Sequence, residues 1–261
     1  MDLNLEGKVA LVLASSQGLG KAIAAELVKE GVSVMISGRD ENKLDSVSQE
    51  LKGFQKGKVA YCKADITKPN EIKQLVQATK SHFGTIDILI NNAGGPPSGS
   101  FEQLSDEQWQ NAFELNLLSY IRAIREALPE LKESGGRIVN IASSSVKQPI
   151  PGLILSNTFR TGIVGLTKTL ADELAPYGIL LHTVAPGRIA TDRVAYLDQV
   201  TADRLGISRE EMEQKARRQI PLRRYGTPEE FAKVVTFLVS GACTYMTGNA
   251  LLVDGGVVKS I

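Results

Sequence analysis

Short, mostly apolar runs alternate along this sequence with longer segments in which apolar residues recur at helical spacing. Seven of the short runs predict strands, over residues 8–14, 32–37, 58–62, 86–90, 137–141, 179–184 and 250–253. Helical spacing and end signals predict helices over residues 19–29, 40–52, 69–83, 105–131 and 157–175, and one that begins at Thr227. Strands that alternate with helices are joined by right-handed crossovers into a parallel sheet. We therefore expect an α/β fold, a doubly wound sheet of seven parallel strands with helices on both faces.

The chain is short enough to form one domain. It has 261 residues, and single α/β domains reach about 250 residues, so we expect one domain over residues 1–261. The polar segment 190–222 follows the sixth predicted strand. A long connection of this kind is usually a lid or binding loop, and a solvated pair of charged helices near residues 208–219 is the alternative. Because ligands of open α/β sheets bind at the carboxyl ends of strands, we favour a substrate lid.

Composition argues against several classes of partner. Lys and Arg total 30 and Asp and Glu total 29, so the chain has no basic excess for nucleic acid. The two histidines and the two cysteines, Cys62 and Cys243, lack ligand spacing, so we expect no metal site and free thiols. No apolar run approaches the roughly 20 residues of a membrane span, and no leader precedes the first strand. We expect a cytoplasmic protein without a membrane partner.

A glycine-containing turn joins the first predicted strand to the first predicted helix. Glycines let backbone N–H groups approach a pyrophosphate, and a helix N-terminus carries partial positive charge. A purely structural turn is the alternative, but the position inside a repeated strand–helix–strand pattern favours a dinucleotide and a Rossmann-type sheet. The residues that we expect to contact this ligand are Ala14, Ser16, Gln17, Gly18, Leu19 and Gly20.

The end of the second predicted strand bears on which dinucleotide binds. An acidic residue there would hold the 2′-hydroxyl of NAD, whereas an arginine accommodates the 2′-phosphate of NADP. The chain has Gly38 followed by Arg39. Asp40 comes next and could either turn inward or pair with Arg39. We expect NADP(H) to be preferred, with NAD(H) still possible.

Further motifs occur in order along the chain. They are Asn91-Asn92-Ala93-Gly94, Asn116 within Glu114-Leu115-Asn116-Leu117, Ser143, Pro186-Gly187 with Ile189 and Thr191, and Asp254-Gly255-Gly256. Each one alone could be a turn or a helix residue that satisfies backbone groups. Together they give residues 5–256 a resemblance to the short-chain dehydrogenase/reductase family, particularly its 3-oxoacyl-acyl-carrier-protein reductase-like members.

The resemblance implies further residues against the cofactor and a reaction. The implied cofactor contacts are Asp65, Ile66, Asn92, Ala93, Gly94, Pro186, Gly187, Ile189 and Thr191. The implied activity is that of an oxidoreductase, which transfers hydride between NADP(H) and a small-molecule carbonyl or alcohol. It also implies that the protein is a homodimer or homotetramer.

The chain departs from this family in its catalytic residues. The resemblance places Asn116 and Ser143 in the catalytic centre, but where the family has a Tyr-x-x-x-Lys pair the chain has Ser156 and Arg160. A phenol has a pKa of about 10, which a nearby ammonium can lower, whereas a serine hydroxyl is far less acidic and an arginine stays charged. Four residues apart on a helix, Ser156 and Arg160 would share one face, and the guanidinium could grip ribose hydroxyls or an anion.

The glycine turn contains a second departure. The family motif usually starts with Thr-Gly, and this chain has Leu13-Ala14. The methyl group of Ala14 lies where backbone should approach the cofactor, so binding could weaken or the turn could shift. Leu13 lacks the hydroxyl that normally ties the turn to neighbouring backbone.

These departures leave three outcomes open. The protein could be a slow reductase, in which Ser143 and Ser156 polarise the carbonyl while water or another side chain moves the proton. It could catalyse a reaction whose proton transfer is easy. It could also bind nucleotide without turnover, as a sensor or partner subunit. We favour an NADP(H)-dependent oxidoreductase with a non-standard catalytic centre of Asn116, Ser143, Ser156 and Arg160.

Overall fold

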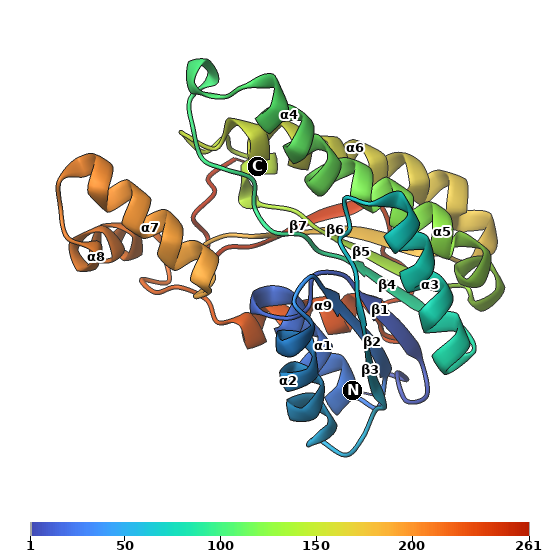
Figure 1. Cartoon of the computed structure of the whole chain (residues 1–261). Coiled ribbons are helices and arrows are strands. Elements are labelled where there is room, and N and C mark those ends of the chain that lie inside the picture. Colours follow the sequence, from blue (N-terminus) through green and yellow to red (C-terminus); the bar gives the residue numbers. More distant parts are fainter. Residues whose placement is uncertain (1, 261) are drawn as a thin grey trace.

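The computed structural model describes residues 2–260, and these contain one sheet of seven parallel strands. The strands are β1 (Val9–Val12), β2 (Ser33–Gly38), β3 (Val59–Lys63), β4 (Ile88–Asn91), β5 (Arg137–Ile141), β6 (Leu180–Pro186) and β7 (Asn249–Val253). They lie in the order β3-β2-β1-β4-β5-β6-β7 (Figure 1). The predicted doubly wound α/β sheet is therefore confirmed. Its order reverses between β1 and β4, the point at which such sheets bind ligands.

Helices cover both faces of this sheet (Figure 1). The α-helices of the described part are α1 (Gly18–Lys29), α2 (Glu41–Lys52), α3 (Pro69–Phe83), α4 (Asp106–Phe113), α5 (Ser119–Ser134), α6 (Ile154–Leu174), α7 (Asp192–Leu205), α8 (Arg209–Gln219) and α9 (Pro228–Val239). Shorter helical segments are η1 (Phe101–Gln103), η2 (Glu114–Leu118), η3 (Ser144–Val146) and η4 (Ala175–Tyr177).

Alternate strand residues enter two separate apolar cores. In β1, Ala10 and Val12 pack into a core shared with α1, α2 and α9, whereas Leu11 packs on the other face with α3 and α5. Because both faces are covered, successive strand residues are all buried, and the strands appear in the sequence as nearly continuous apolar runs. Each fully buried aliphatic side chain contributes about 1.5–3 kcal/mol, so these two cores fix the carboxyl ends of the strands in place.

The predicted helix over residues 105–131 is interrupted in the structure. After α4 ends at Phe113, the segment η2 forms a π-helical turn before α5 begins. Within this turn the Asn116 amide donates to the Ala112 carbonyl at 3.3 Å, and the Ser119 hydroxyl donates to the Leu115 carbonyl at 2.6 Å. Such side-chain bonds to backbone carbonyls compete with the regular helical ladder, and π-turns are frequent at functional sites.

Helices α7 and α8 stand out at one side of the molecule (Figure 1). They enclose a small core of Ala202, Met212 and Ala216. The carboxylate of Asp198 is buried and accepts hydrogen bonds from Arg188 and from the Tyr225 hydroxyl, the latter at 2.8 Å. Burial and this bond to Asp198 raise the pKa of Tyr225 to about 12. The helix pair is thus tied to the chain on both of its flanks.

We expect Asp198→Ala to lower the free energy of unfolding by about 2 kcal/mol, because Arg188 and the Tyr225 hydroxyl both lose the carboxylate to which they donate. Urea denaturation measures this value, and limited proteolysis locates the loosened segment in α7 and α8. The matched control is Asp203→Ala, since Asp203 is exposed on the same helix and, within residues 2–260, its carboxylate accepts a hydrogen bond from Gln199 alone. Its expected effect is within about 0.5 kcal/mol. Equal losses for the two variants would contradict the role given to Asp198.

Three further observations concern membrane spans, metal ions and thiols. Within residues 2–260 no helix is both long and apolar enough to span a bilayer. The same residues contain no cluster of His, Cys, Asp and Glu that could hold a metal ion. Cys62 and Cys243 are free thiols, and burial raises the pKa of each.

Candidate functional site

A cavity of about 610 Å³ opens at the carboxyl ends of the central strands, beside the reversal of strand order. Its size lies within the range of small-molecule and cofactor sites. All the site residues predicted from the sequence line this cavity, except Gly20 and Asn116. The topology therefore brings together motifs that lie as far apart in the chain as Ala14 and Thr191.

The turn from β1 into α1 is held by Ser15. Its backbone N–H donates to the Ser37 carbonyl at 2.7 Å, and its hydroxyl donates to the Val12 carbonyl at 2.7 Å. The Ser37 N–H in turn donates to the Ser15 hydroxyl at 2.9 Å. Ser15 thus supplies the tie to neighbouring backbone that Leu13, which is buried in the core, cannot make.

The N-terminus of α1 is free to take an anion. Gln17 caps this helix without a side-chain hydrogen bond, and the first turn contains no acidic residue. The first N–H groups of a helix lack partners within the helix and carry partial positive charge. A pyrophosphate group fits this end of the cavity.

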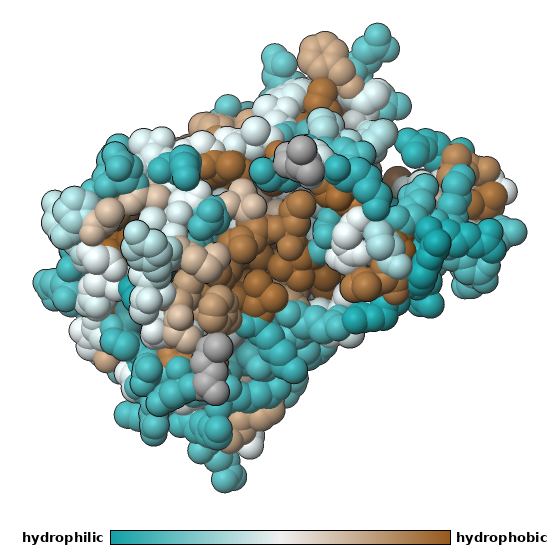
Figure 2. Space-filling model, turned by 180° about the vertical axis from the view of Figure 1, so that it is seen from behind, coloured by the Kyte–Doolittle hydropathy of each residue, from teal (hydrophilic) through white to brown (hydrophobic). Residues whose placement is uncertain are grey.

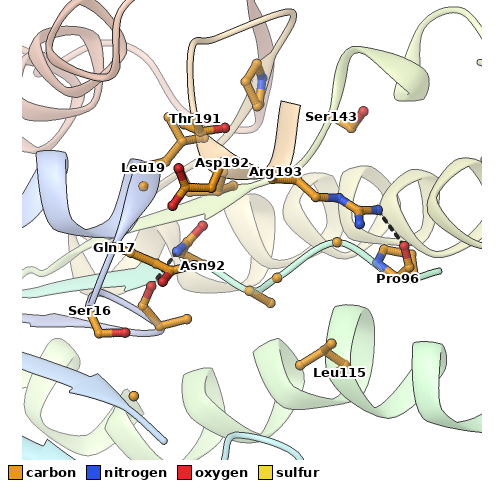
Figure 3. A pocket seen from close by; sticks show the side chains of 18 of the residues that line it. Ser16, Gln17, Leu19, Asn92, Pro96, Leu115, Ser143, Thr191, Asp192 and Arg193 are labelled. Carbon is orange, nitrogen blue, oxygen red and sulfur yellow. Dashed lines mark hydrogen bonds between the residues drawn. The ribbon is translucent and has the colours of Figure 1, made fainter. Parts of the chain in front are cut away.

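Close packing accounts for the presence of glycine at position 20. We expected Gly20 to contact the cofactor, but it does not line the cavity. A Cβ atom at this position would lie 2.6 Å from the Ala14 carbonyl oxygen and 2.7 Å from Nδ2 of Asn92. That amide donates to the Ala14 carbonyl at 3.0 Å and so holds the turn (Figure 3). Ala14 has a φ of 46°, in the left-handed region that favours glycine, and its side chain faces the cavity.

Positive charge gathers at the mouth of the cavity next to β2. Arg39 and Lys43 are both exposed there, and Ser16 lies beside them. The carboxylate of Asp40 accepts a hydrogen bond from the Lys43 N–H at 3.1 Å and caps α2, so it is engaged with the helix and not with Arg39. A Cβ at Gly38 would lie 3.1 Å from the Ser16 hydroxyl, which leaves little space for an acidic side chain there. These residues suit a phosphate group.

Ser143, Ser156 and Arg160 meet at the other end of the cavity. Ser143 caps η3 and accepts from the Ser145 N–H at 3.2 Å, whereas Ser156 and Arg160 are buried on one face of α6. The Arg160 guanidinium donates to the Tyr120 hydroxyl at 2.9 Å, to the Ala93 carbonyl at 3.3 Å and to the Ile141 carbonyl. Its position is therefore fixed by backbone as well as by a side chain.

The phenol nearest to this centre is buried behind it. Tyr120 is fully buried, and its hydroxyl donates to the Ile141 carbonyl at 2.9 Å. Burial raises the pKa of Tyr120, while Arg160 acts in the opposite direction. Its side chain does not line the cavity, so it supports Arg160 and is not placed to touch a ligand. Lys147, the lysine that follows Ser143 most closely, is exposed outside the cavity.

Asn116, which we expect to belong to the catalytic centre, does not line the cavity and lies behind its wall. Its neighbour Leu115 lines the cavity, while the Asn116 side chain is fully buried and bonds to Ala112 in the π-helical turn. Among the described residues its amide oxygen has no hydrogen-bond partner. The helical register, which the sequence pattern did not predict here, decides which of the two side chains reaches the cavity.

Lys43 and Arg193 on the cavity wall were not singled out from the sequence, and Tyr120 was expected only to pack in the core. Lys43 lies in the first turn of α2, four residues after Arg39, Tyr120 supports Arg160, and Arg193 enters the cavity from the start of α7. The only sequence signal for Arg193 is its place in the expected lid. Where long side chains point depends on packing, which a single sequence does not contain.

Comparisons with known proteins agree with this geometry over the whole chain. A family model described as Enoyl-(Acyl carrier protein) reductase matches residues 13–258. The 3-oxoacyl-[acyl-carrier-protein] reductase FabG of Aquifex aeolicus is 35% identical, over 98% of this chain and 100% of its own. Dehydrogenase/reductase SDR family member 4 of Caenorhabditis elegans is 37% identical, over 97% and 95%. The crystal structure of L-sorbose reductase from Gluconobacter frateurii, complexed with NADPH and L-sorbose, has a TM-score of 0.95 at 31% identity and covers 100% of both chains.

Proposed function

This chain belongs to the short-chain dehydrogenase/reductase family, and from that premise we propose that it is an NADP(H)-dependent carbonyl reductase with a non-standard catalytic centre. The observation that carries the proposal is the cavity itself. It joins an uncapped helix N-terminus and a cationic mouth to two serine hydroxyls and a buried guanidinium. The L-sorbose reductase that shares this fold was solved with NADPH and L-sorbose.

The cofactor is proposed to lie along the carboxyl ends of the strands. The N–H groups of Gly18 and Leu19 would hold the pyrophosphate, and Arg39 with Lys43 would hold the 2′-phosphate. The residues proposed for the remaining cofactor contacts are Asp65, Ile66, Asn92, Ala93, Gly94, Pro186, Gly187, Ile189 and Thr191. The phosphate-binding cations favour NADP(H), and NAD(H) remains a weaker ligand.

The chain's own groups in the reaction are Ser143, Ser156 and Arg160. When bound, NADPH supplies a hydride to the carbonyl carbon. The carbonyl oxygen, as it gains negative charge, accepts hydrogen bonds from the two serine hydroxyls. It takes its proton from water, because a serine hydroxyl is a weak acid and an arginine keeps its proton. The product is an alcohol, and we expect a slower proton transfer than a phenol would allow.

Helices α7 and α8, within residues 190–222, are proposed as a lid on the same single domain. Asp192, Arg193, Val194 and Leu197 of α7 line the cavity, so this helix forms one of its walls. Closure of such a lid separates the site of hydride transfer from bulk solvent, while the water that donates the proton stays inside the cavity. Because the segment follows β6 directly, its movement would couple to Pro186 and Gly187 at the end of that strand.

The assembly and location are also proposed. Apolar side chains gather in the middle of the face that Figure 2 shows. The edge strand β7 carries four half-buried apolar residues, from Ala250 to Val253. Both observations support a homodimer or homotetramer, since apolar patches of this kind mark protein interfaces. The two free thiols, Cys62 and Cys243, support a reducing compartment such as the cytoplasm.

The test combines a binding titration with an activity assay. We expect NADPH to bind, as followed by its fluorescence, and a panel of small ketones and aldehydes to cause loss of its absorbance in the presence of the protein. Binding without turnover across the panel would favour a nucleotide-binding sensor or partner subunit. This second candidate is supported by the cavity lining, which within residues 2–260 includes no tyrosine. A protein that binds neither NADPH nor NADH would refute both.

A further inference from the structure

The end of the cavity away from Arg39 contains two guanidinium groups, those of Arg160 and Arg193. Arg160 comes from α6, and its side chain is 5% exposed. Arg193 comes from the first turn of α7 and is half-buried. Figure 3 shows Arg193 extended along the cavity toward Pro96. Positive charge from two different elements therefore converges on one space.

Arg193 occupies a fixed position. Its guanidinium donates to the Pro96 carbonyl at 2.6 Å. A Cβ at Gly95 would lie 2.7 Å from Nε and 2.9 Å from Cζ of Arg193, so this residue's lack of a side chain makes room for the guanidinium. Gly95 and Pro96 thus hold the Arg193 guanidinium against the wall of the cavity. An arginine that is held in this way is preorganised for a ligand.

Neither guanidinium has an acidic partner. The ion pairs found within residues 2–260 include neither Arg160 nor Arg193. Asp192 lines the same cavity, but Figure 3 shows its carboxylate on the side of Gln17 and Asn92, while Arg193 extends the opposite way. Burial lowers the pKa of Arg193, and the positive charge of Arg160 lowers it further. Two guanidinium groups without an acidic partner, one buried and one half-buried, make this part of the cavity suited to bind an anion.

The cofactor does not supply that anion under the proposed function. Its pyrophosphate belongs at the N-terminus of α1 and its 2′-phosphate beside Arg39, both at the opposite end of the cavity. The group that reaches Arg160 and Arg193 is then the substrate. A planar carboxylate matches the geometry of a guanidinium and accepts two hydrogen bonds from it.

We propose that the substrate is a small oxo acid, whose carboxylate is held between Arg160 and Arg193 while its carbonyl group faces Ser143 and Ser156. This inference rests on the proposed function and specifies its substrate class. Apolar side chains also line this cavity, among them Leu115, Leu153, Val194 and Leu197. The rest of the substrate is accordingly an apolar chain or ring without a second charge.

The experiment compares oxo acids with their methyl esters, which keep the carbonyl and remove the charge. The panel contains 2-, 3- and 4-oxo acids, each paired with its ester, and kcat/KM is measured with NADPH. We expect at least one acid to be reduced about tenfold or more better than its ester, which corresponds to one charge-assisted hydrogen bond. We expect Arg193→Met to remove this preference by lowering kcat/KM for the acid and leaving the value for the ester within about twofold to threefold.

Matched variants separate charge recognition from folding. Arg204→Met removes the same charge from an exposed site on the same helix outside the cavity, and we expect it to keep the preference for the acid. Arg193→Lys keeps a cation and should retain part of the preference. Circular dichroism and the Kd for NADPH should be unchanged in Arg193→Met, since Arg193 does not hold the cofactor in this proposal.

The outcomes are distinguishable. If esters and acids are reduced equally well in every pair, or if Arg193→Met slows both members of a pair equally, the oxo-acid proposal is wrong while the carbonyl reductase stands. If NADPH does not bind at all, the proposed function is wrong, and the proposal that depends on it is wrong with it. A preference for the acid that Arg193→Met abolishes and Arg204→Met preserves supports the assignment.

Discussion

A variant that carries both Ser156→Tyr and Arg160→Lys is expected to reduce carbonyl compounds about ten to a hundred times faster than the unchanged protein. The new phenol would project from α6 into the cavity at the place of Ser156, one helical turn from the new ammonium. An ammonium lowers the pKa of a nearby phenol, which can then deliver a proton to the developing alkoxide. The measurement is kcat with NADPH and a carbonyl substrate that the unchanged protein reduces slowly.

Single variants show whether the two groups act together. Ser156→Tyr alone leaves the phenol beside a guanidinium, and Arg160→Lys alone supplies no phenol at position 156, so each should gain less than the pair. A triple variant tests whether the gain depends on the same site. Ser143→Ala, added to the double variant, should remove most of the gain in kcat. If kcat does not rise in the double variant, proton transfer does not limit the rate of this enzyme. The proposal that the lack of a phenol at position 156 slows the reaction is then wrong.

Arg39→Asp is expected to weaken the binding of NADPH by about tenfold to a hundredfold and to change the binding of NADH far less. A hydrogen bond to a charged group contributes about 1.5–3 kcal/mol, and each 1.4 kcal/mol is a factor of ten. The new carboxylate would repel the 2′-phosphate and could accept a hydrogen bond from the 2′-hydroxyl of NADH. Dissociation constants for both reduced cofactors, obtained by fluorescence titration, give the ratio that decides the role.

The control for this prediction is Lys56→Asp, which reverses an exposed charge outside the cavity. It should leave the ratio of the two dissociation constants unchanged. A preference for NADPH that survives Arg39→Asp would transfer the phosphate-binding role to Lys43, the other cation at this mouth of the cavity.

Much of the fold could be predicted from the sequence because burial on both faces makes strands continuous apolar runs. Strand β5 and helix α3 occupy the predicted residues 137–141 and 69–83. The first strand was predicted too long, over 8–14, because Leu13 and Ala14 are apolar although they belong to the turn, where Ala14 takes a positive φ. Hydrophobicity alone does not distinguish a buried turn from a buried strand.

The cavity lining could be predicted where topology alone determines position. Residues that follow parallel strands meet at one edge of the sheet, so Arg39, Asn92 and Ser143 line one cavity whatever their side chains do. Asn116 and Arg193 depend on finer features, the register of a π-helical turn and the direction of a long side chain over Gly95. Those features follow from packing between elements that are distant in the sequence.

The contacts of Arg160 bear on how a centre of this type could have arisen from, or revert to, the family's pattern. The guanidinium bonds to a phenol and to two carbonyl groups at once, and a lysine side chain ends in one compact ammonium that cannot reach all three in the same geometry. Exchange of Arg160 for lysine would take from the Tyr120 hydroxyl, inside the core, the hydrogen-bond donor that the guanidinium provides. The identity of the cation on α6 is therefore coupled to Tyr120 of α5, and the double variant Ser156→Tyr with Arg160→Lys is expected to gain rate at some cost in stability.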